Sequence, residues 1–156
     1  MNPIIDNDSN CLILCIGNRD GGDDAVGPYI ADLLKQSESD LMVIDCGTVP
    51  ENYTSIVKKH NPVCVILVDA VKMGLNPGKI RIVPENRIGV MHISTHGIPL
   101  SVFISYLKQF VETVIFIGIQ PQNMSAKMTN AVRTSAEVVV AAIKNNTVHN
   151  LKILQD

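Results

Sequence analysis

The sequence contains no tryptophan, and only 4% of its 156 residues are aromatic. A buried core must therefore be built from aliphatic side chains, which the 46% hydrophobic content can supply. No apolar run reaches the roughly 18–20 residues that a membrane-spanning helix needs, so we expect no membrane association. The net charge is −2 and there is no basic block, which argues against a nucleic-acid partner.

Paired cysteine motifs are also missing. Cys11, Cys15 and Cys64 lie in apolar, strand-like runs, and Cys46 follows such a run. No Cys-x-x-Cys is present, which disfavours a zinc knuckle and favours reduced thiols in the core. Residues 1–10 lack the basic and apolar regions of a secretory signal. Together these features predict a cytoplasmic protein.

Apolar strand-like runs alternate with segments of helical periodicity along the chain. This alternation predicts an α/β fold: a doubly wound, mostly parallel sheet with helices on both faces, in three layers. The length favours one domain, 1–156, with tails at 1–10 and 147–156. Expected strands are residues 12–16, 41–44, 63–68 and 114–119, an edge strand at 79–83 that could run antiparallel, and a short strand at 151–154. Expected helices are residues 25–36, a segment after a Thr48 cap, 99–110 and 125–144.

Acidic residues follow three of the predicted parallel strands. Asp23 and Asp24 end a glycine-rich loop, while Asp45 and Asp69 come directly after strands. The carboxyl ends of parallel strands meet at one edge of a sheet, so these acids are expected to converge there, with His96 supplied by a later loop. Two carboxylates and an imidazole could bind a divalent metal ion. They could equally act as acid, base and orienting group around a water molecule.

Each of these residues also has a structural explanation. Asp23 and Asp24 favour a helix N-terminus by charge alone. Asp45 is better explained by hydrogen bonds within its own turn. His96, taken alone, is better explained as an ordinary loop histidine. Asp69 is the exception, because a carboxylate that closes an apolar strand loses hydration unless a polar group or an ion meets it.

Several ordered motifs resemble the endopeptidases that mature NiFe-hydrogenase large subunits, most closely the hydrogenase 3-type subgroup. They are Gly17-Asn18-x4-Asp23-Asp24-x2-Gly27-Pro28, Asp45-Cys46-Gly47-Thr48, the segment from Asp69 to Ile82, Thr95-His96-Gly97-Ile98-Pro99 and the run 114–121. The similarity covers roughly residues 11–143. Motifs in matching order and spacing are far more specific than a lone glycine-rich loop.

This resemblance implies a single-domain fold with a five-stranded sheet. It also implies a trio of Asp24, Asp69 and His96 that serves both as catalytic site and as nickel ligands. The implied activity is removal of a C-terminal extension from the nickel-loaded large-subunit precursor, the implied partner. Nickel would arrive with the substrate, and no tightly bound cofactor is expected. We expect Gly17, Asn18, Gly47 and Thr48, in the two turns, to position the substrate.

Two features depart from the family pattern. Cys46 replaces the usual glycine of the second turn, and its thiol could compete as a metal ligand or point into the core. The loop after Pro121 is shorter and more polar than is common in the subgroup. Because this loop could contact the substrate, the sequence does not define which hydrogenase is the partner.

Two other classes compete with the protease interpretation. One is a non-enzymatic, receiver-like module that binds a divalent cation at its acidic strand ends. Such a module needs a lysine after the last core strand, where Gln120 stands here. The other is a dinucleotide-binding fold, which the glycine spacing and the neighbouring acids disfavour.

Overall fold

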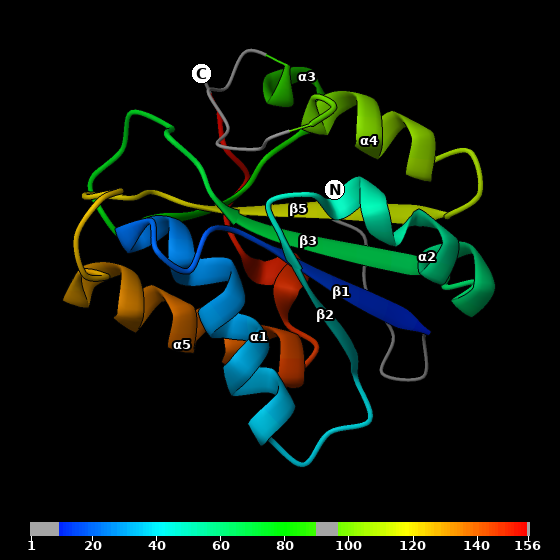
Figure 1. Cartoon of the computed structure of the whole chain (residues 1–156), viewed down its shortest axis with the longest axis horizontal. Helices are drawn as coiled ribbons and strands as arrows, with labels where there is room; N and C mark the ends of the chain where they lie inside the picture. The colour runs from blue at the N-terminus through cyan, green and yellow to red at the C-terminus, as the bar shows by residue number, and fades with distance from the viewer. Residues whose placement is uncertain (1–9, 90–96, 156) are drawn as a thin grey trace.

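The computed structural model describes residues 10–89 and 97–155, which form one five-stranded sheet in the order β2-β1-β3-β5-β4 (Figure 1). The strands are β1 Cys11–Ile16, β2 Met42–Gly47, β3 Cys64–Ala70, β4 Ile80–Ile82 and β5 Thr113–Ile119. β2, β1, β3 and β5 run parallel, and β4 pairs antiparallel with β5. The predicted class, with an antiparallel edge strand, is confirmed.

The two central strands β1 and β3 are buried along their whole length. Their residues are almost all apolar and include many β-branched side chains, which suit a parallel strand covered on both faces. The strands pair in register from Cys11 opposite Cys64 to Cys15 opposite Val68. Strand β2 lies at the sheet edge and is only partly buried.

Helices cover both faces of the sheet (Figure 1). On one face lie α1, Val26–Gln36, and α5, Asn130–Lys144. On the other face lie α2, Thr54–His60, the short α3, Glu85–Ile88, and α4, Leu100–Leu107. Two aliphatic core clusters result, one on each side of the sheet, as the shortage of aromatic residues predicts. Among the described residues no helix is long and apolar enough to cross a membrane.

Some predicted boundaries are wrong, each for a local reason. The helix predicted after a Thr48 cap begins instead with the 3₁₀ turn η2, Pro50–Tyr53, and the preceding Val49 makes no side-chain cap bond. The helix predicted from residue 125 begins at Asn130, because the Asn123 side chain accepts hydrogen bonds from the backbone N–H groups of Ser125 and Ala126. Such side-chain bonds hold the backbone out of a helix.

Strand β3 extends two residues beyond its predicted end, to Ala70. Asp69 therefore lies inside the strand, opposite Gly118 of β5, rather than after it.

The C-terminal segment runs beside β4. A 3₁₀ turn, η3 Val148–Asn150, leads to a single parallel bridge between Ile153 and Ile82 in place of the predicted strand at 151–154. The Leu154 N–H donates to the Ile82 carbonyl at 2.8 Å, and the Leu154 side chain is buried.

Candidate functional site

The loop after β1 brings Asp24 to the carboxyl edge of the sheet through close backbone packing. A Cβ atom on Gly17 would lie 2.0 Å from the Asp24 carbonyl oxygen, and one on Gly27 would lie 2.0 Å from the Ile16 carbonyl oxygen. Only glycine permits such close approaches. The Gly17 N–H also donates to the Gly47 carbonyl at 2.8 Å, which joins this loop to the last residue of β2. These contacts fix the 3₁₀ turn η1, Gly22–Ala25, that carries Asp24.

Asp24 and Asp69 lie close enough for their charges to interact. Asp69 is 0% exposed; its Oδ1 accepts the Ala70 N–H at 2.8 Å, and its Oδ2 has no hydrogen-bond partner among the described residues. Burial, reinforced by repulsion from Asp24, raises the pKa of Asp69 well above its usual value, and the Ala70 N–H opposes this only in part. Asp24 is 4% exposed, and its Oδ2 accepts the Asn18 N–H at 3.2 Å. The structure therefore brings together two of the three predicted trio members.

The neighbouring Asp23 has a different environment from Asp24. Its carboxylate accepts three backbone N–H groups, from Gln122 at 2.8 Å, Asn123 at 3.0 Å and Thr129 at 2.7 Å, and also the Thr129 hydroxyl. Burial acts to raise the pKa of Asp23, but these hydrogen bonds outweigh it and leave the pKa below its usual value. Asp23 thus ties η1 to the loop that precedes α5, a role that the sequence did not indicate.

Asp45 lies inside β2, because this strand extends to Gly47 and does not end at residue 44 as predicted. Its Oδ1 accepts the Gly47 N–H at 3.1 Å, which confirms the turn role. Its Oδ2 forms an ion pair with Arg19 at 2.8 Å, and Arg19 also pairs with Asp32 at 2.8 Å. Thr48 follows in the same turn and is partly exposed.

The Cys46 thiol points into the core rather than toward an open site. The residue is buried within the core cluster on the α2 and α4 side of the sheet. Burial, with a further contribution from the Asp45 carboxylate, raises the pKa of Cys46 to about 12. A thiol with so little thiolate at neutral pH is a poor nucleophile and a poor metal ligand. Of the two alternatives for this residue, the structure supports the core role.

Gln120 is a buried polar residue at the same sheet edge that the sequence interpretation left without a role. Its Oε1 accepts the N–H groups of Met73 at 2.6 Å and Leu75 at 3.3 Å, and its Nε2 donates to the Pro121 carbonyl at 3.2 Å. It therefore fastens the loop after Asp69 to the end of β5. The signal was present in the sequence, because a polar residue closing an apolar strand is the same pattern that singled out Asp69.

His96, the third predicted trio member, lies outside the described residues. The next residue, Gly97, is described, and a Cβ atom there would lie 2.0 Å from Glu51 Oε1. Glu51 belongs to η2, which follows β2. Within residues 10–89 and 97–155, no three His, Cys, Asp or Glu side chains form a metal-binding group. Asp24 and Asp69 alone would give an incomplete metal site.

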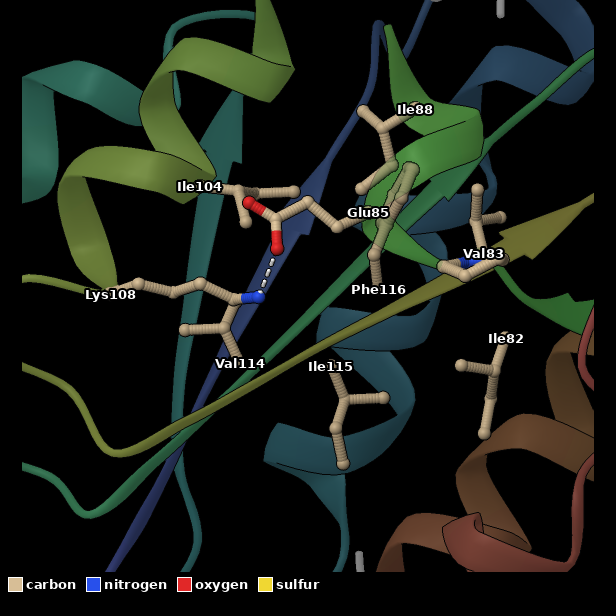
Figure 2. A pocket seen from close by; sticks show the side chains of 10 residues that line it. Ile82, Val83, Glu85, Ile88, Ile104, Lys108, Val114, Ile115 and Phe116 are labelled. Carbon is tan, nitrogen blue, oxygen red and sulfur yellow. Dashed lines mark hydrogen bonds and ion pairs between the residues drawn. The ribbon is translucent and has the colours of Figure 1, made fainter. Parts of the chain in front are cut away.

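A small apolar cavity of about 110 Å³ lies elsewhere, between α3, α4 and the first half of β5 (Figure 2). Figure 2 shows Glu85 and Lys108 facing each other beside it, with their charged groups 2.5 Å apart. The cavity lining contains none of the candidate residues, so it is not part of the candidate site.

Comparison with known proteins gives a consistent set of relatives. The family model described as hydrogenase maturation protease, HycI, matches residues 28–146. The hydrogenase 3 maturation protease of Escherichia coli K12 is 38% identical over 132 residues, which cover 82% of this chain and 85% of the relative. The solution structure of the endopeptidase HycI from Escherichia coli has a TM-score of 0.86 at 34% identity and covers 94% of this chain and 97% of its own. The HycI crystal structure from Thermococcus kodakarensis has a TM-score of 0.80 at 29% identity and covers 92% and 96%.

Proposed function

Because the chain belongs to the hydrogenase maturation protease family, as its motifs predict, we propose that it removes the C-terminal extension from a NiFe-hydrogenase large-subunit precursor. Cleavage follows nickel insertion, and the inserted nickel is the signal that the protease recognises. The ion is cargo of the substrate. We place the reaction in the cytoplasm, in keeping with four buried cysteines that form no disulfide with one another.

The observation that carries this proposal is the buried carboxylate pair. Asp69 has an oxygen without a hydrogen-bond partner among the described residues and a second carboxylate close by. Burying like charges is costly unless a cation offsets them. Carboxylate oxygens and an imidazole are suitable ligands for a divalent first-row metal, and His96 would complete the set. Three protein ligands leave coordination positions open for groups of the substrate.

The acids can also take part in hydrolysis. A water molecule attacks the scissile carbonyl, and a carboxylate within hydrogen-bond distance can accept its proton. Asp24 and Asp69 are both available for this step, and a raised pKa such as that of Asp69 makes a carboxylate a stronger base. Polarisation of the scissile carbonyl by the metal is an alternative way to promote the attack. In either case the peptide is positioned by residues of the two turns beside the acids, which are Gly17, Asn18, Gly47 and Thr48.

The second candidate function is that of a receiver-like module, a domain that binds a cation and has no protease activity. It relies on a lysine after the last core strand. In this chain Gln120 occupies that place, and its amide is engaged in three hydrogen bonds to backbone groups. Specific labelling of Asp69 by a phosphodonor would be required to revive it.

Intact-mass spectrometry of a nickel-loaded precursor tests the proposal. The wild-type protein should shorten the precursor, whereas Asp24→Asn, Asp69→Asn and His96→Ala should leave it uncut while remaining folded. The exposed Asp20, in the same loop as Asp24, supplies the matched control, and Asp20→Asn should cut normally. Processing by all three site variants would overturn the assignment.

A further inference from the structure

Two of the four cysteines lie directly opposite each other on the central strands of the sheet. Cys11 is the first residue of β1 and Cys64 is the first residue of β3, and these strands run parallel, side by side (Figure 1). Cys11 is 9% exposed and Cys64 is 3% exposed. Both side chains belong to the core cluster on the α1 and α5 side. The two thiols therefore share one face of the sheet, at the edge where the parallel strands begin.

Backbone hydrogen bonds hold the starts of the two strands in this register. The Asn10 carbonyl accepts the N–H groups of Val63 at 3.0 Å and of Cys64 at 3.4 Å. Neighbouring strands of a sheet lie about 4.8 Å apart. This separation falls within the range of about 4.4–6.8 Å between Cα atoms that a disulfide bond spans. A bond between Cys11 and Cys64 thus requires side-chain rotation and little movement of the backbone.

The two thiol groups are already in contact. A hydrogen bond with the Cys11 thiol, together with burial, raises the pKa of Cys64 above its usual value. Cys64 therefore holds its proton more strongly than an ordinary thiol, and Cys11, the more exposed of the two, is the thiol that an oxidant meets first. Because the two side chains touch, a second step between their sulfur atoms is intramolecular and does not require a large thiolate fraction at Cys64.

We propose that Cys11 and Cys64 form a peroxide-reactive pair that closes to a disulfide. In the first step the Cys11 sulfur attacks hydrogen peroxide, takes a hydroxyl group to become a sulfenic acid, and water is released. In the second step the Cys64 sulfur attacks the Cys11 sulfur, and the hydroxyl group leaves with the Cys64 proton as a second water molecule. Each sulfur loses one electron overall, and the peroxide gains two.

Closure of the pair protects the Cys11 sulfur from further oxidation. A disulfide is reopened by exchange with another thiol, whereas oxidation to sulfinic or sulfonic acid is irreversible. The bond lies away from the candidate site, because Asp69 follows Cys64 on the same strand at a distance of roughly 16 Å. The inference is therefore independent of the proposed function.

The other two cysteines form a matched control pair. Cys15 of β1 and Cys46 of β2 also lie on neighbouring strands, and the backbone of Cys15 is hydrogen-bonded to the Cys46 thiol. Their side chains nevertheless belong to different core clusters, Cys15 on the α1 and α5 side of the sheet and Cys46 on the α2 and α4 side. The sheet separates the two sulfur atoms, so this pair should stay open although it spans a shorter stretch of chain.

Equimolar hydrogen peroxide added to the folded, reduced full-length chain tests the proposal by mass spectrometry. The intact mass should fall by two hydrogen atoms. After alkylation in denaturant and digestion, Cys11 should be joined to Cys64, with Cys15 and Cys46 alkylated. The melting temperature should rise by about 5–10 °C and return to its starting value when dithiothreitol is added. A double variant with Cys15→Ala and Cys46→Ala should respond in the same way as the wild type.

Cys64→Ala removes the thiol with which Cys11 closes. Its intact mass should therefore rise by one or two oxygen atoms, and circular dichroism before oxidation checks that the variant is folded. The proposal is overturned if the wild type gains oxygen in the same way, or if its thiols stay unreacted while the urea-unfolded chain is oxidised. A disulfide that joins a different pair of cysteines, or two copies of the chain, would also overturn it.

Discussion

Replacing the buried carboxylates of Asp23 and Asp69 by asparagine should change the stability of the protein in opposite directions. Asp23 accepts backbone N–H groups with both oxygens: Thr129 on Oδ1, and Gln122 and Asn123 on Oδ2. An amide has only one acceptor oxygen, so Asp23→Asn leaves one or two partly buried N–H groups without a partner. At about 1–3 kcal/mol for each, the free energy of unfolding should fall by about 3 kcal/mol. For a chain of this size that lowers Tm by about 6–12 °C.

Asp69→Asn removes an ionisable group that the fold disfavours. Burial and the Asp24 charge raise the pKa of Asp69, so the folded state retains its proton more strongly than the unfolded chain. The stability that Asp69 contributes is therefore fully present below the usual carboxyl pKa and is lost as the pH rises through the folded pKa. Each unit of the upward shift corresponds to about 1.4 kcal/mol. Asp69→Asn should accordingly be more stable than the wild type at neutral pH, and its advantage should grow from pH 4 upward.

Asp23 has the reverse pH dependence. Its pKa is lowered in the folded state, so its contribution is present above the usual carboxyl pKa and is lost as the pH falls through the folded pKa. Urea unfolding of the wild type and the two variants from pH 3 to pH 8 measures both trends. The reasoning is refuted if Asp23→Asn matches the wild type at pH 7, or if Asp69→Asn is the less stable variant there.

Two further substitutions test how the site is held together. Gln120→Leu keeps a side chain of similar size but removes the hydrogen-bond acceptor for the loop at 71–75. The free energy of unfolding should fall by about 1–3 kcal/mol, and amide hydrogen exchange in that loop should accelerate. Unchanged exchange would show that Gln120 does not hold the loop in place. Gly17→Ala places a methyl group 2.0 Å from the Asp24 carbonyl oxygen, so the loop must shift and processing should be lost. Gly74→Ala is its control, because a Cβ at Gly74 meets nothing within 4 Å and its positive φ should cost only about 1–2 kcal/mol of stability. Equal processing by the two variants would show that the close packing at Gly17 is unimportant.

The layout of the sheet could be predicted because local pattern and long-range packing agree in the central strands. The runs around residues 11–16 and 63–68 are apolar at every position, which only a strand covered on both faces accommodates. The alternation at residues 79–83 marked the edge strand. Strand ends are less predictable, because β3 continues through Asp69 only where β5 provides partners for it.

Part of the candidate site followed from the topology alone. Acids at the ends of neighbouring parallel strands must lie near one another, and Asp24 and Asp69 do. The difference between Asp23 and Asp24 could not be predicted. It depends on which carboxylate meets the loop before α5, and those hydrogen bonds join residues about a hundred positions apart. The late start of α5 has a similar origin in the side chain of Asn123.

Dependence of cleavage on nickel is the most direct test of the proposed site. Two samples of one large-subunit precursor, one loaded with nickel and one nickel-free, are incubated with the wild-type protein and followed by intact-mass spectrometry. We predict that the loaded precursor loses a C-terminal peptide and that the nickel-free precursor keeps its full mass. Equal rates of shortening in the two samples would contradict recognition of nickel by Asp24, Asp69 and His96.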